Sequence, residues 1–181
     1  MSYDPLVESV RLIESGFEAD PARLSRRRRF AAVAYDVQDD VAATWFVRRG
    51  HNTFWQEFHT LTYRDGAWIR LGGSGHNDDE DGLSDRPRAV DLPGLLVSRG
   101  GGSTTLGRSS FLPLPSACVY YAQLLVAREV TAVDISGAPR PAPRHGRLLA
   151  VWKKRPPVVR ALGETGQEIA MLDLAVGRRR R

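Results

Sequence analysis

The sequence from Cys118 to Leu174 decides the fold class, and it reads CVYYAQLLVAREVTAVDISGAPRPAPRHGRLLAVWKKRPPVVRALGETGQEIAMLDL. It divides into short pieces rich in β-branched and aromatic side chains, and Gly and Pro residues separate these pieces as turns. A series of short strands of this kind is typical of an antiparallel β-sandwich or a barrel-like fold. We therefore expect a mainly β protein. Because such scaffolds carry many unrelated activities, the strands themselves do not indicate a function.

The chain before Cys118 adds further strands and one long polar segment. Residues 30–37 and 41–49 are strand-like and are separated by Gln-Asp-Asp, which suits a hairpin. A second hairpin is expected around Asp65-Gly66, because this pair supplies the positive φ angles of a tight type I′ turn. Residues 72–93 are polar and predict a long loop, and residues 95–102 predict a return to strand. In total we expect about eight to ten strands.

The N-terminal residues predict one or two short helices. Asp4-Pro5 is a good helix start, because Asp caps free backbone amides and Pro tolerates the first helical position. Leu6, Val10 and Ile13 then recur at helical spacing and predict a stripe that packs on the sandwich. Asp20-Pro21 repeats the start signal and predicts a second short helix through Leu24.

These features divide the chain into three parts. We expect residues 1–29 to form a helical segment packed on the main domain, residues 30–175 a β-sandwich-like domain, and residues 176–181 a flexible basic tail. The Pro-rich stretch from Pro139 to Pro143 is expected to stay out of any central strand, because Pro cannot donate to a sheet.

The composition is that of a water-soluble globular protein. Of the 181 residues, 42% are hydrophobic and 26% are charged, and no apolar run reaches the roughly 20 residues that cross a bilayer. The N-terminus carries acids where a signal peptide needs a basic and then an apolar region. We therefore expect a cytoplasmic protein without membrane insertion. Cys118 is the single cysteine and excludes an intrachain disulfide.

The positive charge is concentrated in two arginine runs. The net charge is +5, and the runs Arg26–Arg29 and Arg178–Arg181 carry eight positive charges, so the rest of the chain is mildly acidic. Such runs can bind nucleic acid through its phosphates. Trp55, an aromatic residue of a predicted strand, forms a candidate binding set with Arg48, Arg49 and Arg70, since bases stack on aromatic side chains.

One segment resembles a calcium motif in part. Asn77-x-Asp79-x-Asp81-Gly82 matches the opening of an EF-hand loop, but Arg88 stands where the loop needs its bidentate glutamate. A solvated acidic loop is the preferred interpretation, and Ca²⁺ bound by Asp79, Asp81 and Asp85 is the alternative. The four histidines show no zinc spacing, so no other cofactor is expected.

A catalytic set is incomplete in this sequence. Glu57 and His59 lie two residues apart on one face of a predicted strand, where a carboxylate can orient an imidazole as a general base. A half-buried polar stripe explains the same pattern. Our first hypothesis is therefore a non-catalytic interaction domain that binds a protein partner or a second copy of itself. The alternatives are a small-molecule enzyme with its site around Glu57, His59 and the Gly72–Asp85 loop, and nucleic-acid binding through the arginine runs.

Overall fold

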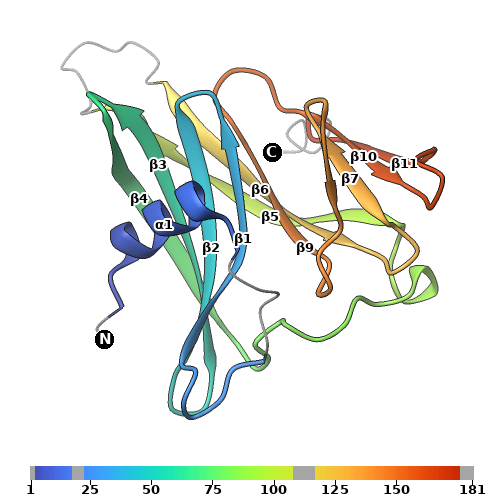
Figure 1. Ribbon diagram of the computed structural model, residues 1–181, viewed down its shortest axis with the longest axis horizontal. Coiled ribbons are helices and arrows are strands. Elements are labelled where there is room, and N and C mark those ends of the chain that lie inside the picture. The colour runs from blue at the N-terminus through green and yellow to red at the C-terminus, as the bar shows by residue number, and fades with distance from the viewer. Residues whose placement is uncertain (1–2, 18–22, 108–116, 176–181) are drawn as a thin grey trace.

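The fold is built almost entirely from antiparallel strands (Figure 1). The computed structural model describes residues 3–17, 23–107 and 117–175. The prediction of a mainly β, sandwich-like protein with an N-terminal helix is confirmed, and no closed barrel occurs in these ranges. The basic tail, residues 176–181, lies outside the described residues, as do residues 20–22 of the second helix expected from Asp20 through Leu24; the described Arg23 and Leu24 are not helical.

The first four strands form a meander that we call sheet A. Its order is β1-β2-β3-β4, with β1 Phe30–Gln38, β2 Val41–Arg49, β3 Phe54–Arg64 and β4 Ala67–Asp78. Asp65 and Gly66 join β3 to β4 with φ angles of 52° and 83°, as the type I′ prediction requires. The turn between β1 and β2 is shorter than expected, because Gln38 belongs to the strand and only Asp39 and Asp40 connect the two.

The other strands form two smaller sheets. Sheet B has the order β5-β6-β9, with β5 Leu96–Thr105, β6 Cys118–Val126 and β9 Arg147–Trp152. Sheet C has the order β11-β10-β7-β8, with β7 Ala132–Ile135, β8 Ala138–Pro141, β10 Val158–Leu162 and β11 Glu168–Asp173. A short 3-10 helix, η1 Ala89–Asp91, precedes β5. Figure 1 shows sheet A on the left, sheet B crossing the middle and sheet C on the right.

Sheet B forms the middle layer, and its strands β6 and β9 are buried on both faces, whereas β5 is largely exposed. Along β6, Val119 and Tyr121 pack into a core with sheet A, while Leu124 and Val126 pack into a second core with sheet C. Strand β9 alternates in the same way, since its odd-numbered Leu149 and Val151 join the first core and its even-numbered residues join the second. The architecture is therefore three stacked sheets with two apolar cores.

Helix α1, Pro5–Ser15, lies on the outer face of sheet A (Figure 1). The Asp4 carboxylate accepts hydrogen bonds from the Leu6 and Val7 amides, so the predicted helix start is confirmed. The predicted packing stripe is wrong in part: Ser9 and Leu12 are the buried residues, whereas Leu6 is 37% exposed. Ser9 turns inward because its hydroxyl bonds to that of Thr44 at 2.8 Å.

Two more expectations are corrected by the strands. Residues 72–78 of the expected polar loop belong to β4, because their backbone pairs with β3 although their side chains are small or polar. The described chain has eleven strands rather than eight to ten, since Ala138–Pro141 pairs with β7 despite its two prolines. This strand lies at the edge of sheet C, where missing backbone donors are tolerated, as expected.

One buried carboxylate joins all three sheets. Asp36, on the edge strand β1, accepts a hydrogen bond of 2.7 Å from the Val151 amide on the free edge of β9. Its other oxygen accepts a bond of 2.6 Å from Arg140 of sheet C. Burial raises the pKa of Asp36, and the Arg140 charge opposes that rise.

No helix of the described chain combines the length and apolar character that crossing a membrane requires.

Replacing this carboxylate is expected to loosen the stack of sheets. Asp36→Ala leaves the Val151 amide and the Arg140 guanidinium without their acceptor, and should lower the free energy of unfolding by about 3 kcal/mol. Urea denaturation measures this loss. Asp85→Ala is the matched control, since it breaks an exposed ion pair with Arg144 and should leave stability almost unchanged. Equal losses in the two variants would contradict the role of Asp36.

Candidate functional site

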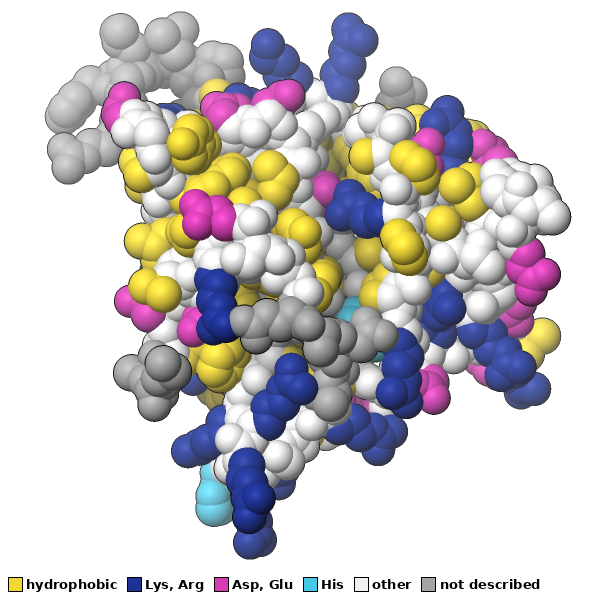
Figure 2. Space-filling view, in the orientation of Figure 1, with side chains coloured by type: hydrophobic (Ala, Val, Ile, Leu, Met, Phe, Trp, Pro, Cys, Tyr) yellow, Lys and Arg dark blue, Asp and Glu magenta, His cyan; other side chains and the backbone are white. Residues whose placement is uncertain are grey.

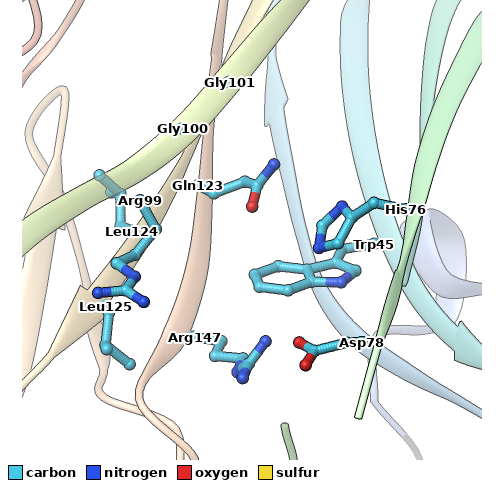
Figure 3. Close-up of a pocket in the computed structure, with 10 residues that line it drawn as sticks. All are labelled: Trp45, His76, Asp78, Arg99, Gly100, Gly101, Gln123, Leu124, Leu125 and Arg147. Atoms are coloured by element: carbon cyan, nitrogen blue, oxygen red, sulfur yellow. The ribbon is translucent and has the colours of Figure 1, made fainter. Parts of the chain in front are cut away.

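A cavity of about 380 Å³ lies between sheets A and B. Ligand pockets commonly measure from about 300 to 1,000 Å³, so the cavity has the size of a small-molecule site. Figure 3 shows polar side chains from both sheets pointing into it. The cavity opens where the apolar core between these sheets gives way to charged and polar residues.

Sheet B supplies three donor side chains to the cavity. Gln123 continues the series of β6 residues that face sheet A, after Val119 and Tyr121. Arg147, the first residue of β9, faces the same way as Leu149 and Val151 and pairs with Leu125 of β6. Both positions would be apolar if they only continued the core. The strand period places Gln123 and Arg147 on the face toward sheet A, diagonally across the β6–β9 pair.

A β-bulge adds Arg99 to the same wall. On β5, Ser98 pairs with Leu124 and Gly100 with Gln123, so Arg99 is the extra residue between them. A bulge redirects a side chain that regular alternation would place elsewhere. Arg99 lines the cavity together with Gly100, whose φ of 143° suits a residue without a side chain.

Sheet A forms the opposite wall from Trp45, His76 and Asp78. Trp45 is buried on β2, and its ring lies 4.9 Å from that of Phe58, between centroids. The ring of His76 also stacks on Phe58, with 6.0 Å between the centroids of the two rings. Both rings therefore sit on a shared aromatic base that fixes this wall.

Gln56 holds Trp45 and the adjoining segment in place. Its buried amide oxygen accepts a hydrogen bond of 2.8 Å from the Trp45 indole, and its nitrogen donates to the carbonyl oxygens of Glu80 and Asp81. Asp81 in turn accepts from the Leu24 amide. A buried network with its polar groups satisfied is rigid, so the cavity is preformed.

The Arg147 guanidinium is clamped between an indole ring and backbone. Its Cζ lies 5.3 Å from the centroid of Trp45, a cation–π contact. On another side it packs against Gly82, where a Cβ atom would lie only 2.2 Å from Cζ. A side chain at position 82 would displace this guanidinium, and the φ of 69° at Gly82 also favours glycine. Burial lowers the pKa of Arg147. The positive charge of Arg99 lowers this pKa further, whereas the negative charge of Asp78 raises it. The Arg147 side chain stays charged at neutral pH.

Neither cavity arginine has an ionic partner in the described part of the chain. No carboxylate oxygen lies within 4.0 Å of the Arg147 or Arg99 guanidinium. Other arginines are paired, among them Arg48 with Glu57 and Arg160 with Asp134. Arg99 is exposed, but Arg147 is half-buried, and an unpaired guanidinium there is costly unless something compensates its charge. The arrangement therefore suits an anionic group placed between Arg147 and Arg99.

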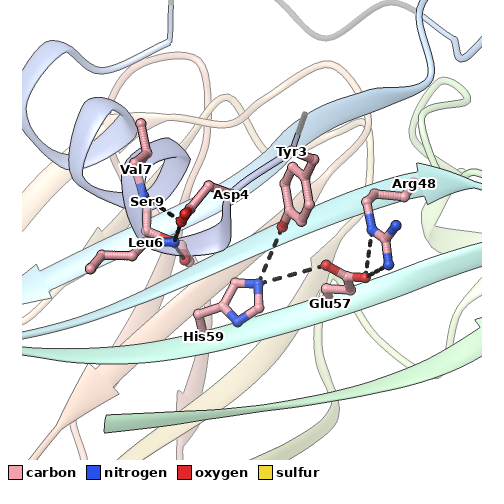
Figure 4. A network of polar contacts seen from close by, with 9 residues as sticks. Tyr3, Asp4, Leu6, Val7, Ser9, Arg48, Glu57 and His59 are labelled. Atoms are coloured by element: carbon pink, nitrogen blue, oxygen red, sulfur yellow. Dashed lines mark hydrogen bonds and ion pairs between the residues drawn. The ribbon is translucent and has the colours of Figure 1, made fainter. Parts of the chain in front are cut away.

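The predicted pair Glu57 and His59 lies on the other face of sheet A and does not line this cavity. Figure 4 shows the two side chains beneath the N-terminal segment, with Tyr3 and Arg48 beside them. The Tyr3 hydroxyl and His59 Nε2 are 3.2 Å apart, and Glu57 lies 3.8 Å from the same nitrogen. Arg48 donates to Glu57 at 2.6 Å and covers the Tyr3 ring.

His59 is enclosed by protein in this network. It is only 6% exposed, and its Nδ1 is buried against Gly73 without a hydrogen-bond partner in the described chain. Burial raises the pKa of Tyr3, and the Glu57 charge adds to that rise. General-base chemistry at His59 would require the N-terminal segment to move, and the catalytic assignment of Glu57 and His59 stays a prediction.

The predicted binding residues are only partly brought together. Trp55 is 43% exposed and pairs with Arg48 across β2 and β3, while Arg49 follows at the same end of sheet A. Arg70 pairs with Leu61, six residues further along β3 and so about 20 Å from Trp55. The structure therefore separates Arg70 from the other three.

The run Arg26–Arg29 reaches this same end of sheet A. The Arg49 amide donates to the carbonyl of Arg29 at 2.8 Å, and all four side chains of the run are exposed. Figure 2 shows Lys and Arg side chains gathered at the lower end of the molecule, where β1 begins. Arg178–Arg181 lies outside the described residues.

The predicted calcium ligands have other uses. The buried Asp81 carboxylate accepts hydrogen bonds from the Leu24 and Leu83 amides, and Asp85 pairs with Arg144, which lowers the pKa of Asp85. Asp79 is exposed. Among the described residues, no three His, Cys, Asp or Glu side chains converge in a way that could hold a metal ion. Calcium binding stays a prediction without a coordinating cluster in that part of the chain.

Sequence reasoning singled out none of the cavity residues, although the Gly72–Asp85 segment that it proposed as part of an enzyme site contains His76 and Asp78. One signal was present: Gln123 and Arg147 interrupt apolar strands at positions that face a core. The bulge that adds Arg99 and the pairing that extends β4 to Asp78 leave no comparable mark in the sequence. A comparison of the chain with protein-family models, with curated proteins and with solved structures finds no match.

The buried His59 predicts a pH dependence of stability. Burial lowers the pKa of His59 from its ordinary 6.5, and Glu57 opposes this. The unfolded chain therefore takes up a proton just below pH 6.5 that the folded chain does not, so the free energy of unfolding should fall as the pH drops below that value.

Urea denaturation above and below pH 6.5 measures this dependence. His59→Gln should reduce the loss of unfolding free energy at low pH, because the titrating group is gone. His51→Gln, at an exposed position, should leave that loss unchanged. An unchanged pH profile in His59→Gln would contradict the assignment.

Proposed function

We propose that this protein is a non-catalytic binding domain that holds a small ligand with an anionic group in the cavity between sheets A and B. The main support for this proposal is the Arg147 guanidinium. It is half-buried, stacks on Trp45 and has no ionic partner among the described residues. Arg99 adds a second positive charge and Gln123 an amide donor. Guanidinium groups bind carboxylates and phosphates with paired, charge-assisted hydrogen bonds.

The residues that line the cavity favour binding rather than catalysis. His76 and Asp78 both line it, but no carboxylate oxygen lies within 4.0 Å of the His76 ring in the described chain. A general base needs a partner that orients it, and a covalent mechanism needs a nucleophile within hydrogen-bond reach of that base. The cavity has a preformed wall and positive charge instead, which are the features of a recognition site.

Removing the guanidinium should weaken anion binding. Arg147→Met keeps the apolar stem of the side chain but removes the guanidinium, with its charge and donors. Isothermal titration with inorganic phosphate, citrate and 4-methylpentanoate tests the binding. We expect at least one of these anions to bind the wild-type chain, and the variant to bind it about tenfold to a hundredfold more weakly.

Arg70→Met is the control, because Arg70 is an exposed arginine on sheet A outside the cavity. It removes the same charge and should leave the affinity unchanged. Thermal melting confirms that both variants fold. Absence of binding by all three anions to the wild-type chain, or equal weakening in both variants, would contradict the proposed function.

A second candidate function is the binding of single-stranded nucleic acid at the basic end of sheet A. The observation that favours it is the contact between Arg29 and Arg49, which brings the run Arg26–Arg29 beside Arg48, Arg49 and the exposed Trp55. A positive surface beside an exposed aromatic ring is the usual arrangement for backbone contacts with base stacking.

Replacing Arg26–Arg29 by serine should weaken binding of a fluorescent oligothymidylate and flatten its salt dependence, because fewer phosphates are neutralised. Fluorescence anisotropy at several salt concentrations measures both. A control that replaces Arg70, Arg128, Lys154 and Arg155, all exposed, removes the same charge from other places. Wild-type binding that is absent even at low salt, or that both variants weaken equally, would count against this candidate.

A further inference from the structure

The cavity contains a carboxylate that an anion site does not need. Asp78 ends β4 on the wall opposite Arg147, and Figure 3 shows its carboxylate pointing toward the Arg147 guanidinium. The two groups do not form an ion pair, since no nitrogen of Arg147 lies within 4.0 Å of an Asp78 oxygen. Opposite charges therefore face the same space from two sides without neutralising each other directly.

The Asp78 carboxylate has capacity left for a ligand. Its Oδ1 accepts a long hydrogen bond of 3.4 Å from the Glu80 amide, and no described residue donates to Oδ2. The Asp78 backbone is fixed as well, because its carbonyl accepts from the Thr53 hydroxyl at 2.9 Å. One free oxygen on a fixed, half-buried residue can accept a hydrogen bond from a cation or a hydroxyl.

A simple anion would satisfy only one side of this space. It would gain from Arg147 and Arg99 but would lie near the negative charge of Asp78, and that carboxylate would lose water without gaining a partner. A ligand with a positive group beside its anionic group would satisfy both walls. A ligand without a positive group leaves the Asp78 carboxylate unpaired, and this cost selects against it. Such selection is stronger than selection by shape alone.

We infer that the ligand is an aminocarboxylate such as a free amino acid, with its carboxylate toward Arg147 and Arg99 and its ammonium group toward Asp78. This inference rests on the proposed function. The indole of Trp45 and the side chain of Leu125 give the cavity an apolar part that a ligand side chain can contact. The volume of about 380 Å³ suits a molecule of this size.

Matched ligand pairs test the inference on the full-length protein. Each pair differs only in the ammonium group: glycine and acetate, L-leucine and 4-methylpentanoate, L-glutamate and glutarate. In isothermal titration, the amino acid of at least one pair should bind about tenfold to a hundredfold more tightly than its partner. The amine 3-methylbutylamine, which lacks the carboxylate of leucine, should bind more weakly than leucine.

The variant Asp78→Asn tests whether the Asp78 carboxylate causes the preference for the amino acid over its des-amino partner. The variant should reduce the affinity for the preferred amino acid to that of its des-amino partner, while binding of that partner stays equal or improves. Arg147→Met should weaken both members of the pair. Asp79→Asn is the control, because it removes the same charge from the exposed neighbouring residue and should leave the preference intact.

The outcomes separate this inference from the proposed function. If des-amino acids bind as tightly as amino acids in all three pairs, the aminocarboxylate assignment is overturned while the anion site stands. If none of these ligands and no other anion binds, both are overturned. A preference that survives in Asp78→Asn also overturns the inference. Circular dichroism and thermal melting verify folding, and the wild-type ratios decide the matter if the variant does not fold.

Discussion

The fold depends on one constraint, the burial of β6 and β9 of sheet B on both faces. Each buried Val or Leu side chain contributes roughly 1.5–3 kcal/mol when it leaves water, and β6 and β9 carry such side chains on both sides. A three-stranded sheet of this kind is stable only when other sheets cover it above and below. Sheet A and sheet C meet this need, and Asp36 ties the free edges of the stack together by bonding to β9 and to Arg140.

The cavity arises where this constraint is locally relaxed. The face of sheet B that contacts sheet A is apolar through Tyr121 and Leu149, and then presents Gln123 and Arg147 instead. A polar group at such a position reduces stability unless it is satisfied. The surrounding structure supports these residues, with Trp45 under the guanidinium, Gly82 making room for it and Gln56 fixing the wall. The chain therefore maintains an arrangement that core packing alone would not favour.

On the outer face of sheet A, the polar side chains pair with one another. The N-terminal segment covers polar side chains there and pairs them with one another, so Glu57, His59, Arg48 and Tyr3 form a closed network. Charges in that network form ion pairs, whereas Arg99, Arg147 and Asp78 in the cavity form none with any residue that the structure describes. Two groups of ionisable residues on opposite faces of one sheet thus differ in the property that matters for ligand binding, which is the availability of an unpaired charge.

Local sequence determined the strands, the turns and the first helix start. Asp65-Gly66 specified its turn through backbone angles, and Asp4-Pro5 specified the helix start through free amides, because both effects act between near neighbours. The prolines placed β8 at an edge for the same kind of reason. The pairing of β4 with β3 decided that residues 72–78 form a strand, although their composition is that of a loop. Only the tertiary structure brought Arg99, Gln123 and Arg147 together opposite Asp78 and set Glu57 and His59 apart from them, because these relations depend on which face of which sheet each residue occupies.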